Sequence, residues 1–105
     1  MTKYGGIVYI MTNKNHTTFY TGVTSDLLTR TIQHRTHYFP GSFTSRYRLH
    51  KLVYYQFFNR IELAIAYEKQ IKAGSRLKNI NLIKSFNAGW VDLFDEIYTD
   101  VWRLD

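Results

Sequence analysis

The sequence predicts an α+β protein with a three-stranded antiparallel sheet flanked by helices, in the order β-β-α-β-α-α. Two observations lead to this prediction. Three short runs are rich in apolar, β-branched and aromatic residues, and helix-capping residues followed by periodic apolar positions come after the second and third runs. The length of 105 residues, 45% of them hydrophobic, is enough for one compact domain and short for two.

The three strands are predicted from residue preferences and turn signals. Residues 6–12 (GIVYIMT) are β-branched and apolar enough for a buried strand. Residues 13–16 (NKNH) are rich in turn formers, so residues 17–23 are interpreted as the returning strand of a hairpin. Residues 49–58 (LHKLVYYQFF) are aromatic and β-branched and form the third predicted strand.

The first helix is predicted over residues 26–35. A Thr-Ser-Asp run supplies N-cap chemistry at its start, and Leu28 and Ile32 form one apolar stripe. At about 100° per residue, Arg30 points away from both of these residues. We therefore expect Arg30 and His34 to face solvent or a groove.

An irregular loop and two further helices follow. Residues 36–46 contain the only proline and are expected to form the loop. A second helix is predicted to begin after Asn59, which would cap it in a capping-box-like arrangement, and to run to about Ala73, where Gly74 stops it. A third helix is predicted over roughly residues 76–86.

Glu68 stands out on the second of these helices because it lies in the middle of an apolar stripe. A buried carboxylate is costly unless it is paired, hydrogen-bonded or bound to a metal. One alternative is a glutamate satisfied by an arginine or a backbone amide, and another is a side chain that reaches solvent at the edge of the stripe. The stripe consists of Ile61, Ala64, Ile65 and Ile71.

Charge divides the chain into two parts. Residues 1–90 contain thirteen Lys and Arg against three acids, a net charge of +10, whereas residues 91–105 contain five acids and one Arg, a net charge of −4. We therefore distinguish a basic domain, residues 1–90, from an acidic aromatic tail, residues 91–105. Cations interleaved with aromatic residues favour nucleic acid as a partner, because neutralising phosphates releases counterions. A merely solvated basic surface is the alternative.

Composition excludes several classes of protein. The chain has no cysteine, which excludes disulfides, thiolate metal sites and cysteine nucleophiles. The apolar run at residues 5–11 is far shorter than the roughly 20 residues that span a bilayer, and it has no basic leader or cleavage site. We expect a soluble cytoplasmic protein with no membrane partner.

A set of spaced residues indicates a more specific class. Ile7-Val8-Tyr9 is followed after ten intervening residues by Tyr20-Thr21-Gly22, then by Arg30 and His34 one helical turn apart, and finally by Glu68 on a later helix. In order, spacing and predicted secondary structure, this set resembles the GIY-YIG nuclease family. The resemblance is greatest to small stand-alone bacterial members related to the N-terminal nuclease domain of the excision-repair subunit UvrC.

The resemblance covers roughly residues 5–85. It implies the same three-stranded α+β fold and a metal-dependent endonuclease that hydrolyses phosphodiester bonds in DNA, in repair or recombination. It also implies that the general base is a tyrosine, most plausibly Tyr9, whose phenol would need help from nearby positive charge. Because side chains alternate along strands, a shared site requires Tyr9 and Tyr20 on one face, for instance with the two residues opposite each other.

The remaining roles that the resemblance implies concern phosphate and metal. Arg30 would hold phosphate oxygens with its fork of donors, and His34 and Tyr20 would position water or phosphate, or assist proton transfer. Glu68 would ligate one divalent cation, Mg²⁺ or Mn²⁺, whose other ligands would be water and phosphate oxygens. Arg46 and Tyr47, in the predicted loop, are candidates for lining the substrate groove, and a packing role for Tyr47 is equally open.

Structural interpretations of the same residues stay open at this point. The two tyrosines could be ordinary sheet aromatics, the Arg30–His34 pair a solvated helix face, and Gly22 a residue that frees the turn into the helix. The alternative function is a nucleic-acid-binding module with the same fold and little or no catalytic activity.

Overall fold

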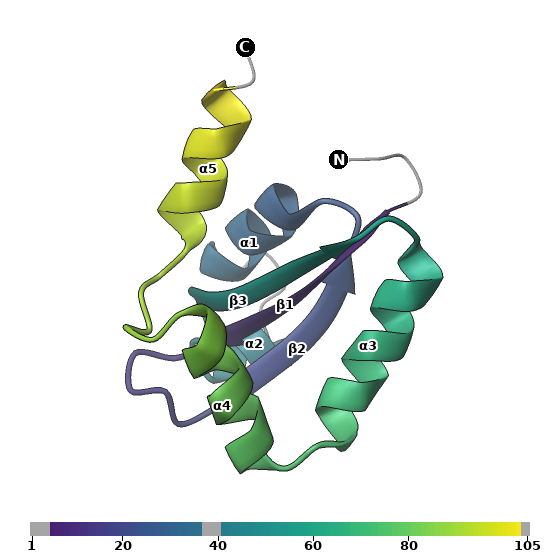
Figure 1. The fold of residues 1–105 in the computed structure, drawn as a ribbon. Helices are drawn as coiled ribbons and strands as arrows, with labels where there is room; N and C mark the ends of the chain where they lie inside the picture. The colour runs from purple at the N-terminus through teal and green to yellow at the C-terminus, as the bar shows by residue number, and fades with distance from the viewer. Residues whose placement is uncertain (1–4, 37–40, 104–105) are drawn as a thin grey trace.

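The computed structural model describes residues 5–36 and 41–103 of the chain. It contains a three-stranded antiparallel sheet in the order β2-β1-β3. The predicted fold class is therefore confirmed (Figure 1). The elements are β1 (Gly6–Thr12), β2 (Phe19–Thr24), α1 (Leu27–Arg35), α2 (Phe43–Arg46), β3 (Lys51–Phe58), α3 (Ile61–Ala73), α4 (Arg76–Phe86) and α5 (Phe94–Arg103).

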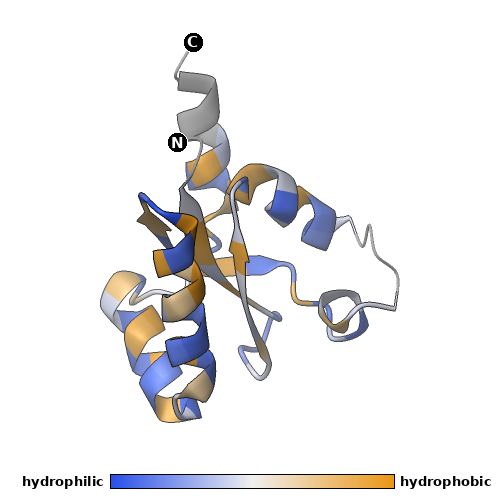
Figure 2. Cartoon of the chain, turned by 90° about the vertical axis from the view of Figure 1, so that its right-hand side faces the viewer, coloured by the Kyte–Doolittle hydropathy of each residue, from blue (hydrophilic) through white to orange (hydrophobic). Residues whose placement is uncertain are grey.

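Helices cover both faces of the sheet, so the central strand β1 is buried on both sides. Alternate side chains of β1 enter two separate hydrophobic clusters. Tyr9 and Met11 pack with α1 and α5, and Val8 and Ile10 pack with α3 and α4. Figure 2 shows the strands between α3 on one side and α1 and α2 on the other. Strand β2 forms one edge of the sheet, and β3 forms the other.

The register of the hairpin places the two motif tyrosines on one face. Tyr9 is paired with Gly22 and Met11 with Tyr20, so Tyr20 lies diagonally across from Tyr9. The prediction that both tyrosines share a face is confirmed, since both pack in the same cluster. The direct pairing of Tyr9 with Tyr20, given as an example, is wrong. The observed register is shifted from it by two residues.

Helix α1 is rotated relative to the prediction. Leu27 and Thr31 are its buried residues, whereas Ile32, predicted to face inward, is 40% exposed. Thr31 can be buried because its hydroxyl donates a hydrogen bond to the carbonyl oxygen of Leu27, at 2.7 Å. The residues at spacing i, i+4 and i+7 from Leu27 therefore face the sheet, and this spacing includes His34.

Two local predictions are corrected, one for the loop before β3 and one for the start of α3. Part of the predicted loop forms the single helical turn α2, because Ser42 accepts a hydrogen bond from the backbone amide of Ser45 as an N-cap. Residues 37–40 lie outside the described residues. Asn59 does not cap α3, whose N-cap is Arg60 without a side-chain hydrogen bond. The end of α3 at Ala73 and the bounds of α4 agree with the prediction.

The first part of the acidic tail packs back on the domain. Leu93 and Ile97 are buried in the cluster that contains Tyr9 and Met11, and the amide of Leu93 donates to the carbonyl oxygen of Leu52. Asp92 forms an ion pair with Arg35 of α1 at 2.5 Å. The first part of the tail thus belongs to the hydrophobic core of this face. No helix within residues 5–36 and 41–103 is long and apolar enough to cross a membrane.

Candidate active site

Three aromatic rings from three elements, β1, β2 and α1, meet on the face of the sheet that α1 covers. The ring centroids of Tyr9 and Tyr20 lie 6.2 Å apart, and that of His34 lies 5.8 Å from Tyr9 and 5.7 Å from Tyr20. The hydroxyl of Tyr9 is within hydrogen-bonding distance of Nε2 of His34, at 3.1 Å. The structure therefore brings three of the predicted site residues into direct contact.

Gly22 provides the space in which these rings pack. A Cβ atom at this position would lie 2.6 Å from the hydroxyl oxygen of Tyr9 and 2.9 Å from Cε2 of Tyr20. Gly22 lies inside β2 and faces Tyr9 across the hairpin, so it does not serve to free the turn into α1. Its role is to let the two tyrosine rings lie against the backbone of the sheet.

The second nitrogen of His34 is also engaged. Its Nδ1 lies 2.9 Å from Oγ1 of Thr44, which is buried on α2, and that hydroxyl lies 3.3 Å from the hydroxyl of Ser42. The ring is therefore held between Tyr9 and Thr44. When both ring nitrogens of a histidine are hydrogen-bonded, the two partners together set the orientation of the ring and the nitrogen that carries the proton.

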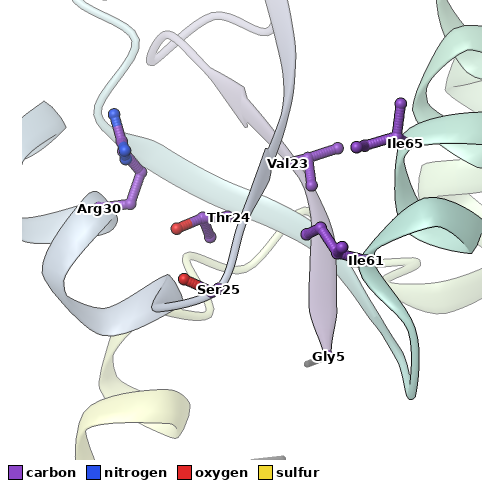
Figure 3. Close-up of a pocket in the computed structure, with 7 residues that line it drawn as sticks. All are labelled: Gly5, Val23, Thr24, Ser25, Arg30, Ile61 and Ile65. Carbon is purple, nitrogen blue, oxygen red and sulfur yellow. The ribbon is translucent and has the colours of Figure 1, made fainter. Parts of the chain in front are cut away.

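Arg30 lies on the same helix, one turn before His34, at the rim of an open pocket. The pocket has a volume of about 530 Å³ and spans the edge strand β2 from α1 to α3. Figure 3 shows Arg30 on one side of β2, with Ile61 and Ile65 on the other. Ile65 was predicted to be buried in the stripe of α3, but it is exposed and lines this pocket.

Glu68 approaches the site from α3, on the opposite face of the sheet. Its side chain is 18% exposed and its Oε2 lies 3.3 Å from Nζ of Lys72, one turn later. It makes no described hydrogen bond to the tyrosines, but its charge acts on Tyr9. The glutamate is thus partly buried and paired with a lysine, rather than with the arginine or backbone amide named as an alternative from the sequence.

The electrostatics of the cluster favour neutral rings. Burial raises the pKa of Tyr9 well above its ordinary value, and the neighbouring Tyr20 and the charge of Glu68 act in the same direction. Arg30 lowers the pKa of Tyr9, but burial outweighs it. Burial also lowers the pKa of His34, and Arg30 adds to that effect. At neutral pH, Tyr9 is therefore a phenol and His34 a neutral imidazole with one unprotonated nitrogen.

The two predicted groove residues on and after α2 are both exposed. Tyr47 is 45% exposed, and its ring centroid lies 4.8 Å from that of Phe43, which in turn lies 6.3 Å from Tyr20. Arg46 has no described contact with the tyrosine and histidine rings. Among the described residues, the ring contacts that link Tyr47 to Tyr20 run through Phe43.

Sequence reasoning missed Thr44 and Phe43, and the structural alternative that it left open for Gly22, freeing the turn into the helix, is wrong. Thr44 and Phe43 belong to a segment predicted as an irregular loop, where no periodicity indicates which side chains point inward. Ser42 directly before the turn is the signal that could have revealed α2, because a serine at an N-cap accepts a hydrogen bond from the amide three residues later.

Comparisons with known proteins identify a family and a similar fold. The GIY-YIG catalytic domain matches residues 5–81. The fold is similar to the solution NMR structure of the UPF0213 protein BH0048 from Bacillus halodurans, with a TM-score of 0.54 and 26% identity over 84% of this chain and 92% of that one. No curated protein matches this chain. The relation to UvrC stays a prediction. Because the family match covers most of the chain and includes both tyrosine motifs, this chain belongs to the GIY-YIG family and has a nuclease-type function on nucleic acid.

Proposed function

We propose that the protein is a divalent-metal-dependent endonuclease that hydrolyses phosphodiester bonds in DNA. The observation that carries this proposal is the hydrogen-bonded pair of Tyr9 and His34, packed against Tyr20 in space that only a glycine at position 22 leaves open. A family match over residues 5–81 supports the reaction class. A role in repair or recombination in the cytoplasm is part of the proposal and rests on the resemblance to UvrC.

We assign proton transfer to His34 acting through Tyr9. The raised pKa of Tyr9 makes a free phenolate an unfavourable base, whereas the neutral His34 has a nitrogen that can accept the phenol proton. As the attacking water gives its proton to the oxygen of Tyr9, the tyrosine gives its own proton to Nε2 of His34 across the 3.1 Å hydrogen bond. Thr44 would hold the ring with Nε2 toward Tyr9.

Arg30 and Tyr20 are assigned to the phosphate. The charge of Arg30 acts on both Tyr9 and His34, so Arg30 would balance the charge that develops on phosphate oxygens. The Tyr20 ring closes the cluster on its outer side and borders a second pocket at the edge of β2. Its hydroxyl would orient a phosphate oxygen or the attacking water.

Glu68 is the residue we assign to the metal. Within residues 5–36 and 41–103, no three His, Asp or Glu side chains lie close enough together to hold a metal ion. A partly buried carboxylate whose charge acts on Tyr9 fits one hard cation that takes its other oxygen ligands from water and phosphate. Bound there, Mg²⁺ or Mn²⁺ would supply charge stabilisation to phosphate oxygens. Lys72 would have to release the carboxylate.

The test is a substitution of Glu68 with a matched control on the same helix. Glu68→Gln keeps the shape of the side chain and removes its negative charge, so plasmid nicking in Mg²⁺ or Mn²⁺ should fall to background. DNA binding in chelator should persist, because it rests on the basic surface. Glu62→Gln, on the exposed first turn of α3, should nick as the wild type does. Wild-type nicking by Glu68→Gln would contradict the metal assignment.

One observation favours the second candidate, a nucleic-acid-binding module without activity. Glu68 already has a cationic partner, Lys72, so the carboxylate is satisfied without a metal. The two candidates differ in one result. A wild-type protein that binds DNA in chelator but nicks no DNA form in either metal would establish the binding module and exclude the nuclease.

A further inference from the structure

A second pocket lies beside the proposed site, on the far side of Tyr20 from the pocket that Arg30 borders. It is open, has a volume of about 470 Å³ and wraps around the edge strand β2. Most of its lining is aromatic or basic. The lining residues are Phe19, Tyr20, Thr21, Phe43, Lys72 and Asn79. The pocket therefore shares Tyr20 with the cluster of Tyr9 and His34.

The packing of the fold does not explain why the large apolar side chain of Phe43 is exposed in this pocket. It is 48% exposed, on a single turn of helix that is fixed by the Ser42 cap and by the bond from Thr44 to His34. Its ring lies 6.3 Å from Tyr20 on one side and 4.8 Å from Tyr47 on the other, measured between centroids. A rigidly placed, half-exposed aromatic ring that continues a row of rings from the site is suited to stacking on another flat ring.

Charge at the pocket matches a nucleic-acid strand. Lys72 lines the pocket from α3, opposite Phe43, and its side chain is about half exposed. Residues 1–90 carry a net charge of +10. An aromatic face beside a cation is the combination by which proteins hold a base and its phosphate in single strands. A lipid or an acidic peptide would match the cation but not the row of rings.

We propose that this pocket receives one unpaired base of the DNA strand that is cut, stacked on Phe43, with Lys72 at the adjacent phosphate. The proposal rests on the proposed function, because it places the base next to the scissile phosphate at Tyr20. A base within a duplex has both ring faces covered by its neighbours and cannot stack on a side chain. The substrate class is therefore DNA that is single-stranded, or that carries an unpaired segment, at the cut.

The test uses stacking as a readout that does not depend on cleavage. An oligothymidylate with one central 2-aminopurine is titrated with protein in chelator, and the matched duplex is titrated in parallel. Stacking on Phe43 should quench the 2-aminopurine fluorescence. Phe43→Ala should abolish the quenching and weaken single-strand binding by about 5- to 100-fold. It should leave duplex binding within about twofold of the wild type, because duplex binding rests on phosphate contacts.

Two matched variants control for folding and for loss of a ring. Phe57→Ala removes a phenylalanine that is 45% exposed on β3, the opposite edge of the sheet, and should bind as the wild type does. Phe43→Trp keeps an aromatic face and should retain single-strand binding. Circular dichroism melting verifies that each variant is folded.

The outcomes separate this inference from the proposed function. If wild-type protein does not quench the single strand, or if Phe43→Ala binds it as tightly as the wild type, the stacking site is refuted. If duplex nicking is nevertheless observed in Mg²⁺ or Mn²⁺, the nuclease proposal stands without it. If quenching depends on Phe43 but no DNA form is cut, the stacking site stands and the nuclease proposal fails.

Discussion

Replacing Gly22 by alanine tests whether the tyrosine cluster depends on the missing side chain. Carbon atoms in good contact lie about 3.5–4.0 Å apart. The added Cβ would lie 2.6 Å from the hydroxyl oxygen of Tyr9 and 2.9 Å from Cε2 of Tyr20, so both rings must move by about 0.6–1 Å. Tyr9 is only 2% exposed, so its ring is enclosed by other protein atoms and can move only if they move too. Its 3.1 Å hydrogen bond to His34 should be lost.

This displacement has an expected cost in stability and in rate. Overpacking of a well-packed core costs about 1–3 kcal/mol, and each kcal/mol lowers the Tm of a domain of this size by about 4–8 °C. A misplacement of about 1 Å at a catalytic group can cost about 100-fold in rate. We expect Gly22→Ala to show both effects, measured by calorimetry or circular dichroism melting and by plasmid nicking.

Gly89→Ala is the matched control. Its Cβ would meet only Cγ2 of Val91, at 3.5 Å, and its backbone lies outside the left-handed region. This variant should melt at or slightly above the wild-type temperature, because alanine at a compatible position reduces the entropy of the unfolded chain. A Gly22→Ala protein that melts and nicks as the Gly89→Ala protein does would refute the account of the cluster.

Three further predictions concern Thr44, His34 and the tail. Thr44→Val removes the hydroxyl that holds His34 and should lower nicking by about 10- to 100-fold, the range for groups that orient a metal-binding histidine, whereas Thr44→Ser should restore it. Histidine ¹⁵N spectra should show an altered His34 tautomer only in the valine variant. Because the folded pKa of His34 is lowered below the unfolded value of about 6.5, the unfolded chain binds more protons between the two values. Unfolding free energy should therefore decrease as pH falls below about 6.5, and nicking should decrease as pH falls through the lower folded pKa; flat profiles in urea melts and pH–rate measurements would contradict this. Leu93→Ala should cost about 2–5 kcal/mol in urea unfolding, because the tail contributes this buried side chain to the core, and an unchanged midpoint would show that it does not.

Local structure was predictable where a local pattern causes it. The bounds of β1 and α4 agree with the prediction, because a β-branched run and a serine cap act over a few residues. The predicted inward face of α1 was wrong at Ile32, although Leu28 does pack against the core, because apolar residues are not the only ones that can be buried. Thr31 satisfies its own hydroxyl within the helix, which allows the face that carries His34 to turn toward the sheet.

The sequence by itself determined the residue types of the candidate site, their order and the elements that carry them. Only the tertiary structure decided how they meet: the register that sets Gly22 against Tyr9, the rotation of α1 that turns His34 toward the sheet, and the short helix that places Thr44 behind it. These contacts join segments far apart in the chain. Their geometry depends on how the whole core packs, and a local pattern of residues carries no information about that packing.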